Sequence, residues 1–133
     1  MLPLLKRFGA LILFTLPCLS QAQSQQIDLE AVMKNMGHSY KQAMKAQQPT
    51  IMSHALKDLK ERVQEAKRAR FSKAAEQSQQ GLDKVLERIA SAEQQLAQGQ
   101  LEAARETLKD IDTLRKKYHE LHEPPGFWEL LFG

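Results

Sequence analysis

Residues 82–121 read LDKVLERIASAEQQLAQGQLEAARETLKDIDTLRKKYHEL. Apolar side chains recur at steps of three and four on both sides of Gly99, which is the spacing of one face of an amphipathic helix. Gly99 favours the end of the first helix, because glycine adopts the left-handed conformation of a C′ residue. We expect helices over about 75–98 and about 101–121, the second ended by Pro124 and Pro125.

The same spacing extends towards the N-terminus. Asp28 is a good N-cap for a first helix, and the residues at 47–50, QQPT, separate it from a second helix over about 51–70. Strand-forming residues are few. Short links favour antiparallel neighbours, so the sequence predicts an all-α fold, an antiparallel up-down-up-down four-helix bundle.

Residues 1–22 have the character of a cleaved secretory signal peptide. Lys6 and Arg7 precede an apolar run that ends near SQA at 20–22, as a signal peptidase requires. Cys18 is the single cysteine and leaves with this segment, so we expect neither a disulfide nor a Cys-x-x-Cys-His haem attachment. The net charge of +3 also loses two units, which removes the argument for nucleic acid. We expect a periplasmic protein with no stable membrane insertion.

The bundle domain, residues 23–123, contains one pair of residues that suits a metal cofactor. The first and last helices of such a bundle are antiparallel, so Met33 and His119 are expected at the same end and at similar depth. A thioether and an imidazole suit low-spin haem iron, and two filled axial positions suit electron transfer, not catalysis. Met36 and His122 compete for these roles, since each lies three residues further on.

Two motifs around this pair resemble those of the soluble periplasmic cytochrome b562 family. They are DLEAVM at 28–33 and RKKYH at 115–119. The resemblance implies one noncovalent haem b, with Met33 and His119 as the axial ligands of its iron. Gly81 and Gly99 keep the family's separations from the histidine, whereas Leu82 stands where the family has a phenylalanine against the haem.

Other side chains are expected to complete the haem site. Arg115 lies one turn before His119, so its guanidinium is expected to reach a haem propionate. Apolar side chains of the inward stripes would bury the macrocycle. They are Met36 and Tyr40, then Leu82, Val85 and Leu86, then Leu108 and Ile111, while Tyr118 is expected in the core or at the rim.

Two further hypotheses compete with a cytochrome that exchanges electrons with unidentified redox partner proteins. The first is a haem-free periplasmic bundle that acts as an adaptor or stress-binding protein. The second is a surface Zn or Cu site at His119 and His122, which two ligands make weak. No signature of an enzyme is present, because a Glu-x-x-His motif, a phosphate loop and a supported nucleophile are all missing.

Residues 124–133 form an aromatic C-terminal tail without a counterpart in the family. Its large apolar residues are Phe127, Trp128, Leu130, Leu131 and Phe132. Burial of three such side chains is worth on the order of 5 kcal/mol. We expect the tail to fold back over the end of the bundle and shield the haem edge, with a docking element for a partner or membrane as the alternative.

Overall fold

The computed structural model describes residues 26–71 and 74–119. These residues form four helices, α1 (Leu29–Lys45), α2 (Pro49–Lys67), α3 (Ala75–Ala97) and α4 (Leu101–His119), and they contain no strand. None of these helices combines the length and the apolar character that a membrane span requires. The expected signal peptide and the aromatic tail lie outside the described residues.

The helix boundaries follow local chemistry. The Asp28 carboxylate accepts a hydrogen bond of 3.1 Å from the Ala31 N–H at the start of α1. Gly99 has a φ of 73°, and the N–H of Gln100 reaches back to the Gln95 carbonyl, which closes α3. The expected start of the second helix at Ile51 was wrong: α2 begins at Pro49, because a proline at the first helical position has no N–H to leave unpaired.

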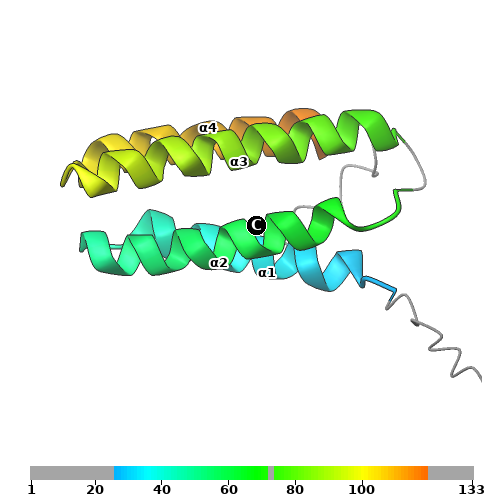
Figure 1. Cartoon of the computed structure of the whole chain (residues 1–133), viewed down its shortest axis with the longest axis horizontal. Helices are drawn as coiled ribbons and strands as arrows, with labels where there is room; N and C mark the ends of the chain where they lie inside the picture. Colours follow the sequence, from blue (N-terminus) through cyan, green and yellow to red (C-terminus); the bar gives the residue numbers. More distant parts are fainter. Residues whose placement is uncertain (1–25, 72–73, 120–133) are drawn as a thin grey trace, which may run out of the picture.

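The four helices are arranged in two layers, α1 with α2 and α3 with α4 (Figure 1). The colours in the figure show that each helix runs opposite to the one before it. Ion pairs agree with this direction: Lys60 of α2 lies 2.6 Å from Glu93 of α3, while Lys67 pairs with Asp83. Between α3 and α4, Thr107 donates a hydrogen bond of 2.8 Å to Gln95. The predicted antiparallel four-helix bundle is confirmed.

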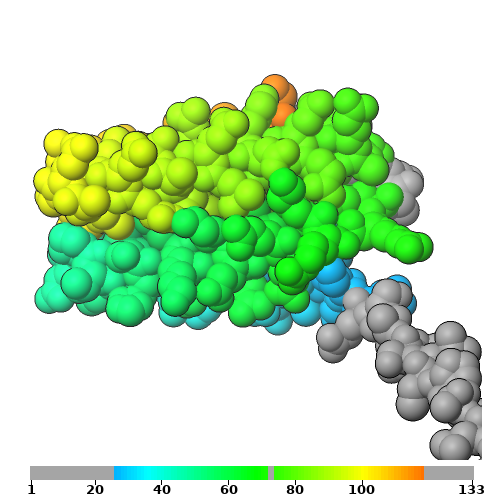
Figure 2. Space-filling view, viewed as in Figure 1, coloured from blue at the N-terminus to red at the C-terminus, as the bar shows by residue number. Residues whose placement is uncertain are grey.

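The two layers lie against each other along the length of the bundle (Figure 2), and the core lies where they meet. Its fully buried large side chains are Met52, Leu56, Leu59, Val63, Ile89 and Leu108. Contact is extensive within each layer and between α2 and α3, but α1 and α4 touch only sparsely. The seam between α1 and α4 is therefore the least tightly packed side of the bundle.

One arginine joins α1 and α4 at the end of the seam where α1 ends and α4 begins. The guanidinium of Arg105, in the first turns of α4, donates hydrogen bonds to the backbone carbonyls of Met44 and Ala46, the second at 2.9 Å. These are unpaired carbonyls at the C-terminal end of α1. Arg105 thus fixes the register of α1 against α4 at this end of the seam.

Candidate functional site

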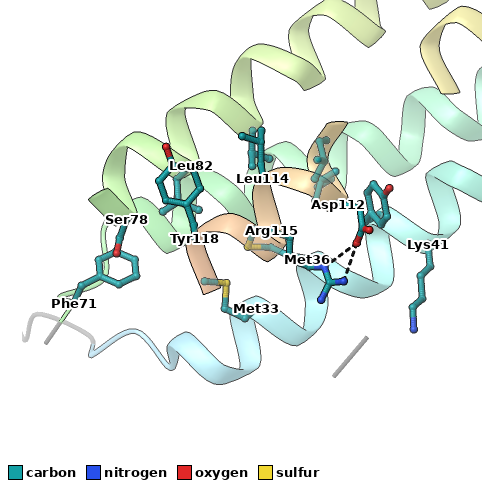
Figure 3. A pocket seen from close by; sticks show the side chains of 16 residues that line it. Met33, Met36, Lys41, Phe71, Ser78, Leu82, Asp112, Leu114, Arg115 and Tyr118 are labelled. Atoms are coloured by element: carbon teal, nitrogen blue, oxygen red, sulfur yellow. Dashed lines mark hydrogen bonds and ion pairs between the residues drawn. The ribbon is translucent and has the colours of Figure 1, made fainter. Parts of the chain in front are cut away.

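A cavity of about 150 Å³ lies at the end of the bundle where α1 begins and α4 ends (Figure 3). All four helices and the link after α2 contribute to its walls. Eight of its sixteen lining residues have large apolar side chains, namely Met33, Met36, Leu59, Phe71, Leu82, Val85, Ile111 and Leu114. The remaining residues are Gly37, Tyr40, Lys41, Ser78, Gly81, Asp112, Arg115 and Tyr118.

The expected wall residues lie in two places. Met36, Tyr40, Leu82, Val85 and Ile111 line the cavity. Leu108 is fully buried in the core and Leu86 is half-buried against it, and neither lines the cavity. The contact of all seven side chains with a macrocycle stays a prediction.

Met33 and Met36 share the cavity. Both are half-buried and line it, and Figure 3 shows the Met33 thioether directed from α1 towards the C-terminal turn of α4. Residue 119 is the last residue of α4, but its side chain and the whole of His122 lie outside the described part of the chain. The structure therefore brings two thioethers to the site and leaves the choice of histidine open.

The heights of Met33 and residue 119 along the bundle can be compared through the pair Tyr40 and Asp112. Tyr40 of α1 and Asp112 of α4 line the same cavity, and the Asp112 charge acts on the Tyr40 phenol. Met33 stands seven residues before Tyr40, and residue 119 stands seven after Asp112. Seven residues are about two helical turns. Because the helices are antiparallel, the backbone of residue 119 lies at the level of Met33 and on the face of α4 that carries Asp112.

Asp112 is the centre of a polar group on the cavity wall. Its Oδ1 accepts hydrogen bonds from Arg115, 2.9 Å from Nε and 2.8 Å from Nη2, and its Oδ2 lies 3.0 Å from the Lys116 ammonium. Burial raises the pKa of the Asp112 carboxyl, but these two cations outweigh burial and hold the pKa below its ordinary value. Asp112 is therefore a carboxylate at neutral pH.

Tyr40 faces this group from α1. Burial, followed by the Asp112 charge, raises the pKa of its phenol above the ordinary value of 10.0, although Arg115 opposes the shift. The phenol is thus neutral at physiological pH and offers the cavity a hydrogen-bond donor. Asp112 and Tyr40 make the otherwise apolar wall polar along the α1–α4 seam.

The ring of Tyr118 packs on Gly81 of α3. A Cβ atom at position 81 would lie 2.8 Å from Cγ of Tyr118, closer than such atoms approach. Gly81 is buried, so the absence of its side chain makes room for the ring inside the cavity. Tyr118 is half-buried at the rim, as expected, and it covers part of the space next to Leu82 (Figure 3).

The model of the cytochrome b562 family matches residues 28–123. The chain belongs to the cytochrome b562 family. No curated protein matches the chain. Cytochromes b562 are electron-transfer proteins that bind haem b, so the cavity is the place to test for a fit to that group.

The lining fits a b-type haem in its chemistry. The apolar walls suit the burial of a macrocycle, a thioether is an established axial ligand of haem iron, and a guanidinium can pair with a propionate. The volume of about 150 Å³ is below the roughly 300–1,000 Å³ of ordinary ligand pockets. The cavity is bounded by the sparse α1–α4 seam and by the Tyr118 ring.

The alternative metal sites gain no support from the described residues. His38 and His54 are both exposed, and residues 26–71 and 74–119 contain no group of three His, Cys, Asp or Glu side chains that could hold a metal ion. A surface site at His119 and His122 falls outside what the structure describes.

Sequence reasoning missed Asp112 and the position of Tyr40 against it. The signal for Asp112 was present, because Arg115 and Lys116 follow it at the i+3 and i+4 spacings that pair on a helix. Arg115 was expected to be directed at a propionate; it lines the cavity, but Asp112 already holds its guanidinium.

Proposed function

We propose that this protein is an exported electron carrier that binds one haem b noncovalently, with Met33 and His119 as axial ligands. The observation that supports the proposal is the cavity at the end of the bundle where α1 begins and α4 ends, which Met33 lines and near which α4 ends at residue 119. Membership of the cytochrome b562 family supports the same cofactor.

Each part of the site would then have one task. The thioether and the imidazole would bind the iron from α1 and α4, and the apolar walls would exclude water. Arg115 would pair with a propionate while Asp112 orients its guanidinium. The haem would supply the change of oxidation state, and two protein ligands would leave no open position for a substrate. We therefore propose electron transfer without enzymatic turnover.

Export is proposed on the signal peptide predicted at 1–22. Without Cys18 the mature chain has no thiolate for covalent haem attachment, so retention of the haem depends on the two axial bonds and on burial. The redox partner proteins are not identified by these features.

A visible spectrum tests the proposal most directly. Protein expressed with haem available, then purified and reduced, is expected to show the sharp bands of low-spin six-coordinate haem. A colourless, stably helical protein that takes up no added haem would instead favour the haem-free adaptor.

We also expect Asp112 to lower the reduction potential. A carboxylate on the cavity wall favours the more positive, oxidised iron, so Asp112→Asn should raise the potential. One charge about 10 Å away at an effective dielectric of 20 corresponds to about 1.7 kcal/mol. The Asp112 side chain is 38 % exposed and paired with two cations, so we expect a rise on the order of 30 mV.

The matched control is Asp110→Asn. Asp110 lies on the same helix, is 61 % exposed and pairs with Arg88 at 3.5 Å, outside the cavity lining. Spectroelectrochemical titration of both variants measures the difference. Equal potentials for Asp112→Asn and Asp110→Asn would show that the Asp112 charge does not act on the haem.

A further inference from the structure

Cationic side chains surround the opening of the cavity. Lys41 of α1 and Arg115 of α4 line it. The ammonium nitrogens of Lys84 and Lys117 lie 5.9 Å and 5.7 Å from the centroid of the Tyr118 ring, which also lines it. We call Lys41, Lys84, Arg115 and Lys117 the basic rim. Three of the four helices contribute to it.

Asp112 pairs with Arg115, but the three lysines of the basic rim have no such partner among the described residues. Within the described residues, Lys41, Lys84 and Lys117 have no carboxylate oxygen within 4.0 Å. The acidic residues nearby in sequence are already paired, Asp83 with Lys67 and Asp112 with both Arg115 and Lys116.

Cations further along the bundle are arranged differently. Lys60 pairs with Glu93, Arg88 with Asp110, and Lys109 with Glu106. The cavity mouth thus carries three lysines that have no close counter-charge among the described residues. Charge of one sign around a concave opening with apolar walls attracts molecules of the opposite sign over several ångströms.

We propose that the basic rim is the docking surface for an acidic redox partner protein. This inference rests on the proposed function, because it needs haem in the cavity. Complementary charge raises the rate of encounter and orients the partner, and contact with the Tyr118 ring keeps the two ammonium groups at the cavity edge. Bound haem would supply one electron from its ferrous iron, the partner's metal centre would accept it, and no atom would be transferred.

The test compares two double charge reversals in the mature, haem-loaded protein. Lys84→Glu with Lys117→Glu inverts half of the basic rim. Lys45→Glu with Lys57→Glu makes the same change of charge at two lysines that are also exposed and also lack a carboxylate partner among the described residues. Unlike Lys84 and Lys117, they do not lie over the Tyr118 ring that lines the cavity.

Stopped-flow mixing of each reduced protein with an oxidised blue-copper protein of acidic surface measures the rate of electron transfer. At low ionic strength we expect the Lys84/Lys117 variant to react about tenfold more slowly than the wild type, and the difference to disappear at high salt. With a blue-copper protein of basic surface it should react faster than the wild type. The Lys45/Lys57 variant should stay within about twofold of the wild type with both acceptors.

The outcomes separate this inference from the proposed function. Wild-type protein without a low-spin haem spectrum would contradict the proposed function itself. Intact spectra with equal rates for the two double variants would overturn the docking surface alone. Sedimentation with phosphatidylserine-containing vesicles, lost in the Lys84/Lys117 variant, would assign the basic rim to a membrane surface and would also overturn the proposal.

Discussion

Met33→Ala and His119→Ala should each abolish the six-coordinate low-spin spectrum of the haem-loaded protein. Each change removes one axial bond, and noncovalent haem has no other attachment to the chain. The iron should become high-spin, and the haem should be lost during gel filtration. Visible spectra of the oxidised and reduced variants, recorded before and after gel filtration, measure both effects.

Met36→Ala and His122→Ala are the matched controls, because each residue lies three positions from the proposed ligand. Met36 lines the same cavity as Met33, so its loss should weaken packing but keep the low-spin bands. A larger loss of haem from His122→Ala than from His119→Ala would move the ligand to His122. The same result for Met36→Ala against Met33→Ala would move the other ligand to Met36.

Haem should stabilise the bundle strongly. A ligand that binds only the folded state adds about 2.7 kcal/mol to the free energy of unfolding at a hundredfold excess over its dissociation constant. For a bundle of this size, that corresponds to a rise in Tm of about 10–20 °C. Circular dichroism at 222 nm should show that the haem-free protein is helical at low temperature and melts earlier.

The sparse α1–α4 contact at the cavity end explains why haem should stabilise the bundle. Without haem the cavity is bounded by the sparse α1–α4 seam, whereas Arg105 holds α1 and α4 together at the other end. Haem that joins the two helices would close the weaker end. A Tm that does not change on titration with haem would exclude specific binding, and a rise in Met33→Ala as large as in the wild type would exclude this mode of binding.

Most of the fold was predictable because it depends on local chemistry. The spacing of apolar residues predicted four helices, and Asp28 and Gly99 act at their ends as their side chains and backbone freedom require. The end of the second helix was less predictable. The prediction extended it to Arg70, but α2 ends at Lys67, and Ala74 before α3 has a φ of 46° without a side-chain cap. The link at 68–74 reads RARFSKA and contains no glycine, proline, asparagine or aspartate.

The location of the candidate site could be predicted from the sequence, but the side-chain contacts within it could not. The motifs around Met33 and His119 predict that the site lies where the first helix begins and the last helix ends. In an antiparallel bundle these two ends lie side by side. The packing of Tyr118 on Gly81 depends on α3, and the electrostatic effect of Asp112 on Tyr40 crosses from α4 to α1. Neither pair follows from positions along a single helix.

The sequence by itself determined the helices, their order, their antiparallel directions and the family, because these depend on residue spacing and short links. Only the tertiary structure decided which side of the bundle is loosely packed, where the cavity lies, and which charges around it remain unpaired. These properties depend on how side chains from different helices fill or fail to fill the same volume. Arg105 of α4 binds the C-terminal end of α1 at one end of the bundle. At the other end, the missing side chain of Gly81 in α3 makes room for the Tyr118 ring.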